Sequence, residues 1–198
     1  MYIMKSIFQF SFFCFVLFTS SFGLSLPKCN GEYQTHCHGT ILHKNGEKYV
    51  GEIENYKYNG KGTYLYINGN IYKGNFKDGI INGKGAFEFA NGDKYEGEFK
   101  NGFFHGFGIG TFSDGSSYSG QYQNDVPHGK GTLKLSNGDK YNGGFKGGFK
   151  HGKGNLTFAN GNIYEGEFLN DMYNGKGTLT MANGDKKKGF FKNNLFIE

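Results

Sequence analysis

The segment 128–146, HGKGTLKLSNGDKYNGGFK, decides the fold because polar and apolar residues alternate on both sides of its Asn-Gly turn. Alternation with a period of two predicts one strand before the turn and one after it. A two-residue loop would place Leu133 and Tyr141 on opposite faces. A three-residue loop, 136–138, with Gly138 in the left-handed conformation pairs Leu133 with Tyr141 and gathers the large apolar side chains on one face. We therefore predict a hairpin with the three-residue loop.

This hairpin recurs every 23 residues without an insertion. Each copy has a tyrosine, a glycine two residues later and an apolar residue two further on. The tyrosines are Tyr49, Tyr72, Tyr95, Tyr118, Tyr141 and Tyr164, and Lys187 takes the seventh place. Seven units therefore fill residues 37–198, and residues 24–36 form an N-terminal cap. Because one hairpin cannot bury its rings alone, each unit should depend on its neighbours.

The glycine columns have separate predicted roles. Gly143, between Tyr141 and Phe145, should leave a slot for an aromatic ring of a neighbouring unit. Gly129 and Gly131 should lie where the chain turns from one hairpin to the next. The columns together predict an all-β fold: an elongated, single-layer, twisted antiparallel sheet of seven repeated hairpins, which is about fourteen strands.

Composition supports a repeat array and disfavours several function classes. Glycine accounts for 35 of the 198 residues, Trp is absent, and 22 Phe with 14 Tyr must supply the core. The formal net charge is +5, but every basic residue is Lys, which disfavours a nucleic-acid partner because base and phosphate recognition commonly uses the Arg fork. The sequence has no Ser/His/Asp set, no carboxylate pair, no phosphate loop and no CxxC, so we expect no enzyme, no metal site and no cofactor.

The N-terminal residues have the anatomy of an export signal. Lys5 precedes an apolar run from Ile7 to Phe18, and small residues follow, with Ser21 and Gly23 suited to cleavage after Gly23. We therefore predict a signal peptide over residues 1–23 and a mature chain in a secreted, luminal or periplasmic location. The alternative is an uncleaved membrane anchor, because the apolar stretch is about long enough to span a bilayer.

The cysteines agree with export. Cys14 lies inside the signal, and Cys29 and Cys37 remain as an even pair that we expect to form a disulfide in an oxidising compartment. The alternative is two unpaired buried thiols. Asn155 begins the single N-glycosylation sequon, which only a eukaryotic secretory route would use.

The pattern Tyr-x-Gly-x-Phe, a short turn and (His or Asn)-Gly-Lys-Gly-Thr, as in KYEGEFKNGFFHGFG from Lys94, resembles the membrane occupation and recognition nexus (MORN) repeat. The resemblance covers nearly all of the chain after the signal. It implies a single-layer sheet of hairpins with roles in scaffolding, dimerisation and, in some members, contact with acidic phospholipids. Gly110 replaces an aromatic residue and Gly144 an acidic one, so we expect the fourth and fifth units to bend or loosen.

One column alternates between histidine and asparagine. It consists of His36, Asn59, Asn82, His105, His128, His151 and Asn174. Either side chain can make a turn hydrogen bond, whereas asparagine is a poor substitute for a histidine metal ligand. We therefore interpret this column as turn capping.

A second polar column is made of lysines: Lys61, Lys84, Lys130, Lys153 and Lys176. In a regular ribbon they would line one edge, where they could attract anionic head groups. The alternative is that they serve solubility and protect the edge from aggregation. Five glutamates alternate with the ring column, so we expect them on the face opposite the rings, where they need not cancel the lysines: Glu52, Glu96, Glu98, Glu165 and Glu167.

A sheet of this kind offers surfaces rather than a reactive cleft. The first hypothesis is a non-catalytic exported repeat scaffold that mediates protein–protein interaction or self-association. The alternative function is peripheral membrane attachment, with acidic phospholipids bound along the lysine column.

Overall fold

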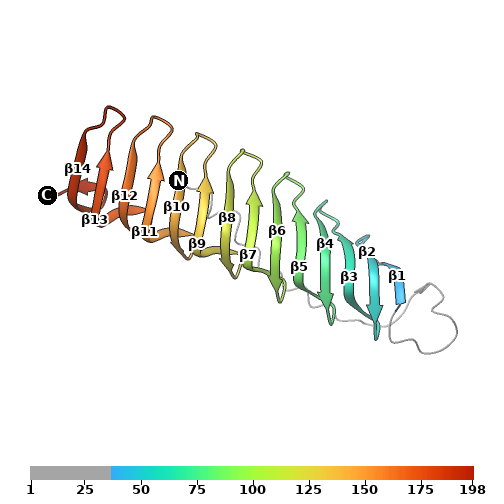
Figure 1. Cartoon of the computed structure of the whole chain (residues 1–198). Helices are drawn as coiled ribbons and strands as arrows, with labels where there is room; N and C mark the ends of the chain where they lie inside the picture. The colour runs from blue at the N-terminus through green and yellow to red at the C-terminus, as the bar shows by residue number, and fades with distance from the viewer. Residues whose placement is uncertain (1–36) are drawn as a thin grey trace. The chain divides into compact units, whose positions relative to one another are not determined.

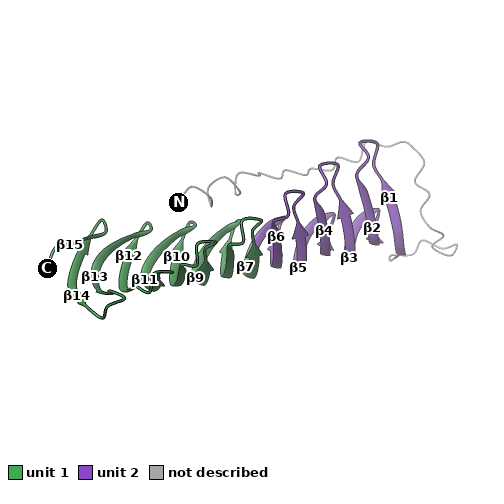
Figure 2. Cartoon of the chain, turned by 90° about the horizontal axis from the view of Figure 1, so that it is seen from above, with its two compact units in different colours: residues 1–9, 105–198 green, residues 10–104 purple. Residues whose placement is uncertain are grey.

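The computed structural model describes residues 37–198, which form two compact units. The N-terminal unit holds residues 37–104, and the C-terminal unit holds His105–Glu198; Figure 2 draws them in purple and green. The predicted signal, cap and Cys29–Cys37 disulfide involve residues outside this range and stay predictions. Residues 37–198 contain no helix, and hence no helix able to cross a membrane.

All the described elements are β-strands. They are β1 (Cys37–Leu42), β2 (Lys48–Glu54), β3 (Lys57–Leu65), β4 (Ile71–Lys77), β5 (Ile80–Glu88), β6 (Lys94–Lys100), β7 (Phe103–Thr111), β8 (Ser117–Gln123), β9 (Val126–Lys134), β10 (Lys140–Lys146), β11 (Phe149–Thr157), β12 (Ile163–Leu169), β13 (Met172–Thr180), β14 (Lys186–Lys192) and β15 (Leu195–Phe196). Within each unit the strands pair antiparallel in chain order (Figure 1). The predicted all-β fold of antiparallel hairpins is confirmed, and β15 adds one strand to the fourteen expected.

The predicted register of the hairpin β9–β10 is confirmed. Leu133 pairs with Tyr141, and the amide of Leu135 donates to the Asp139 carbonyl oxygen at 2.8 Å. Gly138 has a φ of 93°, the left-handed conformation that a glycine bulge requires. Leu133, Tyr141 and Phe145 are all buried on one face, which we call the ring face. The opposite face is called the outer face.

Five column tyrosines lie against glycines of two adjacent strands: Tyr49, Tyr72, Tyr118, Tyr141 and Tyr164. A Cβ on Gly154 would be 2.5 Å from Cζ of Tyr141, and one on Gly143 would be 2.6 Å from the same atom. The predicted slot exists, but the prediction of its occupant is wrong for Gly143. The ring over Gly143 is Tyr141 of its own strand, and the same ring extends onto Gly154 of the next hairpin.

Aromatic contacts join each hairpin to the next. The Phe145 ring meets Tyr118 of the preceding hairpin edge-on at a centroid distance of 5.0 Å, and Tyr141 of its own hairpin at 5.1 Å. Tyr141 in turn meets Phe168 of the following hairpin at 4.9 Å. Edge-to-face pairs of this kind add to the stabilisation from burial alone. A single layer can therefore bury its rings, because neighbouring hairpins cover one another.

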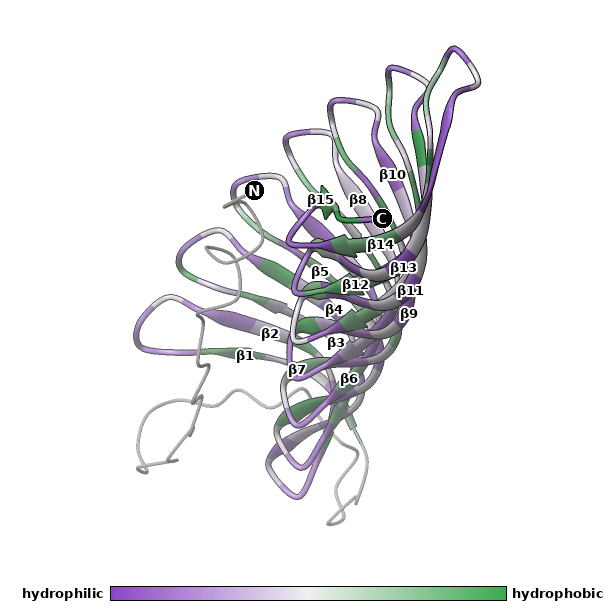
Figure 3. Cartoon of the chain, turned by 90° about the vertical axis from the view of Figure 1, so that its left-hand side faces the viewer, coloured by the Kyte–Doolittle hydropathy of each residue, from purple (hydrophilic) through white to green (hydrophobic). Residues whose placement is uncertain are grey.

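From Asn59 to Asn174 the His/Asn column lies in β-bulges, so the prediction that these residues cap turns is wrong, whereas His36 lies outside the described residues. Tyr122 pairs with Pro127 and Gly120 with Gly131, which leaves three residues, 128–130, opposite Gln121. Gly129 in that bulge has a φ of 63°. Bulges bend strands, and Figure 3 shows the strands bent in both units.

The chain turns between hairpins at a different place from the one predicted. Two consecutive residues with positive φ connect each pair of hairpins. These pairs are Asn55–Tyr56, Asp78–Gly79, Asn101–Gly102, Asn124–Asp125, Gly147–Gly148, Asn170–Asp171 and Asn193–Asn194, whose amino-acid types vary. Such dihedral pairs are the mark of tight turns that match strand twist. The Gly129 position lies inside a strand instead.

Side chains at the three-residue loops link consecutive hairpins. The Ala159 amide donates to Oδ1 of Asp139, and the Ala182 amide donates to Oδ1 of Asn162, both at 2.9 Å. Asn70 accepts from the Ala90 amide in the same way. Each bond satisfies a loop amide of the next hairpin, so the loops form a ladder beside the ring column.

The two unusual glycines are accommodated locally. A Cβ on Gly110 would lie 2.7 Å from the hydroxyl oxygen of Tyr122, which takes the space that an aromatic residue fills in other hairpins. A Cβ on Gly144 would collide with the carbonyl oxygen of His151, so the bulge of β11 closes against this glycine.

Candidate functional site

The side chains of the ring face stabilise the fold and are not available to bind a ligand. All six column tyrosines are almost fully buried, and each hydroxyl donates to the carbonyl oxygen three residues later, at distances from 2.6 to 3.1 Å. Burial raises the pKa of Tyr164 to about 12 and raises the pKa of Tyr141 further. These hydroxyls stay protonated and hydrogen-bonded, so the ring column supplies structure rather than a reactive group.

The raised tyrosine pKa values predict alkaline unfolding. A group whose pKa is higher in the folded chain stabilises the fold below its unfolded pKa, about 10 for tyrosine, and loses that contribution at higher pH. The free energy of unfolding should therefore be insensitive to tyrosine ionisation up to pH of about 10 and then fall. Tyrosinate absorbance and circular dichroism, followed together, should change in one step. Ionisation of the column tyrosines with the sheet intact would contradict this.

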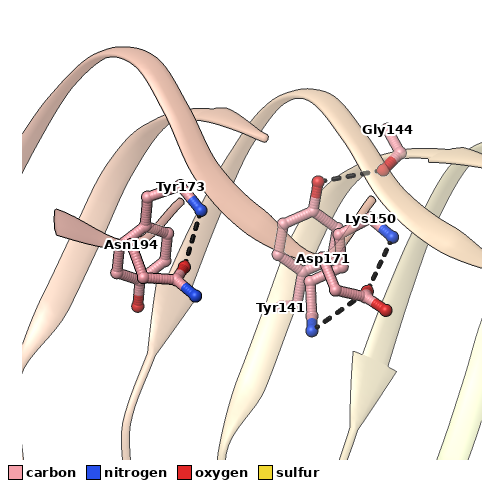
Figure 4. A network of polar contacts seen from close by, with 6 residues as sticks. All are labelled: Tyr141, Gly144, Lys150, Asp171, Tyr173 and Asn194. Carbon is pink, nitrogen blue, oxygen red and sulfur yellow. Dashed lines mark hydrogen bonds and ion pairs between the residues drawn. The ribbon is translucent and has the colours of Figure 1, made fainter. Parts of the chain in front are cut away.

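One ion pair lies among the rings of the C-terminal unit. Lys150 Nζ is 5.8 Å from the centroid of the Tyr141 ring and 3.4 Å from Oδ1 of Asp171, and both charged side chains are mostly buried. The same carboxylate oxygen accepts from the Lys150 backbone amide at 2.9 Å (Figure 4). Asn194 accepts from the Tyr173 amide in the next hairpin at 2.8 Å. The pair therefore belongs to a turn contact that recurs in the adjacent hairpin.

Removal of the Asp171 carboxylate should destabilise the C-terminal unit. Asp171→Ala leaves Lys150 with an unpaired ammonium and an unpaired amide, and we expect a loss of about 2 kcal/mol in urea unfolding. Asp171→Asn keeps an amide acceptor, as Asn194 does, and should lose less than half as much. Equal losses from the two variants would show that the backbone bond contributes nothing.

A second polar cluster lies on the N-terminal unit. His43 Nε2 hydrogen-bonds the Tyr58 hydroxyl, and the Tyr64 hydroxyl donates to Glu47 at 2.7 Å. Burial lowers the pKa of His43, which favours the neutral ring. A neutral histidine paired with one phenol, and a carboxylate paired with another, are typical of satisfied polar side chains rather than of a nucleophile and its base. Among residues 37–198, no three His, Cys, Asp or Glu side chains lie close enough to share a metal ion.

The outer face carries the side chains that differ between hairpins. Positions that alternate with the ring column are exposed or half-exposed in both units. The residues that directly follow the column tyrosines are Val50, Lys73, Glu96, Ser119, Asn142 and Glu165, and Lys188 follows Lys187. The residues of the ring face thus recur along the sheet, while the residues of the outer face change from hairpin to hairpin.

The lysine column lies on this outer face, so its predicted position along an edge is wrong. Lys61, Lys84, Lys130, Lys153 and Lys176 are exposed and stand within β3, β5, β9, β11 and β13. Lys84 is directly opposite Glu98, and Lys153 is directly opposite Glu167. The glutamates lie on the face opposite the rings, as expected, but the lysines share that face, so the expectation that the two charges stay apart is wrong. Whether these lysines bind anions stays a prediction.

The outer face also has a shallow hollow of about 620 Å³ in the C-terminal unit. Its floor is the glycine row that the tyrosine rings cover from the other side. Its walls include Lys153, Glu167, Lys176, Lys188 and Phe190. Mixed charges around a backbone floor can hold an extended chain, but they do not form a catalytic constellation.

The loop ladder and the turn acceptors were not predicted from the sequence. Asp139 and Asn162 share a column two residues after the Asn of each loop, and this 23-residue period was available as a signal. The turn acceptors, Asp171 and Asn194, could not be found in this way because their column also holds Tyr56 and three glycines.

Comparison with known proteins bears on the repeat directly. Six consecutive segments match the family model described as the MORN repeat: 49–71, 72–94, 95–117, 118–140, 141–163 and 164–186. No curated protein has a matching sequence.

Several solved structures have a similar strand arrangement but low similarity scores. The SAS-4 (dCPAP) TCP domain of Drosophila melanogaster, in complex with a proline-rich motif of Ana2, is 17% identical over 78% of this chain and 90% of that one, with a TM-score of 0.43. The G-box domain of the microcephaly protein CPAP is 10% identical over 79% of this chain and 100% of that one, with a TM-score of 0.31. Virginiamycin B lyase of Staphylococcus aureus is 12% identical over 78% of this chain and 55% of that one, with a TM-score of 0.20.

Proposed function

Because this chain belongs to the MORN-repeat family, we propose that it is a non-catalytic scaffold that holds a protein partner, or a second copy of itself, on its outer face. The observation that carries the proposal is that one face of the sheet is buried and nearly constant from hairpin to hairpin, whereas the other is exposed and variable. The ring face repeats Tyr, Gly and an aromatic or aliphatic residue in six of the seven units, and the tyrosines are buried within the sheet. The outer face is solvent-exposed and varies, which is the arrangement expected of a binding surface on a rigid frame.

The size of the outer surface also supports binding over catalysis. Each strand presents several side chains to solvent, and consecutive strands place them in continuous rows. Exposed apolar residues stand among the polar ones, for example Ile109 on β7 and Phe190 on β14. Mixed apolar and polar residues on a firm surface are typical of protein–protein interfaces.

Site-specific photo-cross-linking tests this function. A benzophenone side chain at Ser119 or Thr178, both on the outer face of the C-terminal unit, should trap a defined partner or a second copy in the native compartment. The matched control is Asn160, which is exposed in a loop. The proposal fails if the control position gives the same adducts, or if neither outer-face position gives any. Sedimentation of the purified chain separates self-association from binding to another protein.

A second candidate function is attachment to acidic phospholipids. On the outer face of β13–β14, Lys176, Lys186 and Lys188 surround the half-exposed Phe190, and Lys176 Nζ is 5.6 Å from that ring. Lysines beside an exposed aromatic ring favour the boundary of an anionic membrane. Co-sedimentation with phosphatidylserine vesicles should then occur at low salt, and Lys186→Gln/Lys188→Gln should weaken it. Equal sedimentation with neutral vesicles would rule out this candidate.

We also propose that the chain is exported and cleaved after Gly23, and that Cys29 and Cys37 are joined. The apolar run behind Lys5 and the even cysteine pair support this. Mass spectrometry of the protein from its native source should find Leu24 at the N-terminus. It should also find one linked peptide pair that separates on reduction. An intact Met1 would contradict cleavage.

A further inference from the structure

Three consecutive strands of the C-terminal unit carry six lysines and no acidic residue. β9, β10 and β11 read VPHGKGTLK, KYNGGFK and FKHGKGNLT. Lys150 lies on the ring face over Tyr141. The other five alternate with the ring column, so they share the outer face, and all are exposed: Lys130, Lys134, Lys140, Lys146 and Lys153. We call these five side chains the lysine patch.

The fold itself does not account for the lysine patch. Lys134 is paired directly with Lys140 across the two strands. Like charges in directly opposite positions destabilise a sheet, so this pair costs stability. On neighbouring β12, Glu165 and Glu167 share the outer face, whereas the nearest loop carboxylate, Asp139, is engaged by the amides of Ala159 and Asn137. Lys153 is opposite Glu167, but the other four lysines have no carboxylate opposite them in the neighbouring strands. A patch of five cations with one acidic residue opposite it matches a negatively charged partner.

A missing side chain within the patch marks where such a partner can be held. In two other hairpins, the residue that directly follows the glycine two positions after the column tyrosine covers the bulge and accepts from one of its amides. Glu52 Oε1 accepts from the Lys61 amide at 3.1 Å, and Gln121 Oε1 accepts from the Lys130 amide at 3.0 Å. The equivalent residue between Lys130 and Lys153 is Gly144, which has no oxygen to offer.

The space beside this bulge is open. A Cβ on Gly129 or Gly175 would collide with the side-chain oxygen of Gln121 or Glu167, whereas a Cβ on Gly152 would meet no atom within 4 Å. The His151 carbonyl oxygen lies against Gly144, so the opening is above Gly152. Among residues 37–198, no side-chain oxygen accepts from the Lys153 amide. At this hairpin the repeat thus has no side chain over the bulge, and lysines surround the open position.

We propose that the outer face of β9–β11 binds an extended acidic segment of a polypeptide, with one of its carboxylates beside Gly152 and others among the lysine patch. The inference rests on the proposed scaffold function and specifies the chemistry of the partner. Asp and Glu side chains offer the kind of oxygen acceptor that Glu52 and Gln121 provide at the equivalent bulges, and their charge is opposite to that of the lysines. Carboxylates spaced along a strand-like peptide can meet lysines on adjacent strands.

Titration of the full chain with a fluorescent oligoglutamate peptide tests this proposal. Fluorescence anisotropy should show binding that weakens as salt is added. Lys134→Gln/Lys140→Gln and Lys130→Gln/Lys153→Gln should each weaken it by about tenfold. The matched control is Lys176→Gln/Lys188→Gln on β13–β14, which removes the same charge from a bulge already covered by Glu167 and should change affinity by less than about twofold.

Gly144→Glu tests the empty position itself. Its carboxylate would occupy the bulge as Glu52 does, and peptide binding should fall by about tenfold. Circular dichroism verifies that this variant folds. If it does not fold, the loss of binding in Lys130→Gln/Lys153→Gln tests the same position.

Three results would overturn the inference. The first is that the control variant Lys176→Gln/Lys188→Gln weakens peptide binding as much as the lysine-patch variants do. The second is that the peptide does not bind at all. The third is that phosphatidylserine vesicles, and not the peptide, bind in a way that depends on the lysine patch. The scaffold function would survive any of these if Ser119 or Thr178 still cross-links a partner, because both positions lie outside the lysine patch.

Discussion

Gly154→Ala should lower the free energy of unfolding by about 3 kcal/mol, although alanine is normally preferred to glycine within a strand. The reason is the Tyr141 ring, whose Cζ lies 2.5 Å from the place that the new methyl carbon would take. All three nearest atoms belong to that ring, so the tyrosine is the first obstacle that the methyl group meets. Urea unfolding of the purified chain, followed by circular dichroism, measures the loss.

A double-mutant cycle makes this prediction specific. If the ring causes the clash, Gly154→Ala should cost much less in a Tyr141→Leu chain than in the natural one. Asn142→Ala is the control, because Asn142 is exposed on the outer face next to Tyr141 and should change stability by about 0.5 kcal/mol or less. An unchanged penalty in the Tyr141→Leu background would mean that the backbone, and not the ring, excludes the methyl group.

Tyr141→Ala should cost about 4 kcal/mol, a larger loss than we expect from Gly154→Ala or Asp171→Ala. The ring is 1% exposed, meets Phe145 and Phe168 edge-on, and donates its hydroxyl to the Gly144 carbonyl oxygen at 2.9 Å. The alanine chain loses all of these contacts and leaves a cavity between two hairpins. Hydrogen exchange should show faster opening of β10, β11 and β12, which carry these partners.

Tyr141→Phe separates the ring from its hydroxyl. This variant keeps the ring contacts and loses one hydrogen bond, so it should cost about 1 kcal/mol. A loss as large as that of the alanine variant would show that the hydroxyl, rather than the stacked rings, holds the hairpins together.

The hairpin and its register were predictable because both depend on local pattern. Only a three-residue loop puts Leu133 and Tyr141 on one face, and the structure has that register. The period of 23 residues likewise identifies every column tyrosine from the sequence alone. Local alternation and repetition are therefore sufficient to predict this fold.

The bulge was not predictable from the same reasoning. Gly129 resembles a turn residue, yet the true turns use dipeptides as different as Asn124–Asp125 and Gly147–Gly148. The turns have no sequence in common, whereas the Gly-x-Gly pattern recurs in nearly every unit and is therefore easily mistaken for the connection between hairpins. A bulge also changes which residues share a face, so Lys153, expected at an edge, stands opposite Glu167.

The candidate binding surface depends on that change of face. Once the lysines are known to share the outer face with the glutamates, the strands where glutamates are absent become distinctive. Gly144 then has two consequences: it lets the His151 carbonyl oxygen approach β10, and it leaves the Lys153 amide without the side-chain acceptor present at Lys130. Neither consequence can be predicted from the repeat pattern without the three-dimensional structure.

Hydroxyl-radical footprinting of the folded chain tests the central claim most directly, because it reports the exposure of each tyrosine in solution. The six column tyrosines should be modified far more slowly than Tyr56, which lies in a turn and is 63% exposed. In denaturant the difference should disappear. Column tyrosines that react as fast as Tyr56 in the folded chain would contradict a ring face buried by a single sheet.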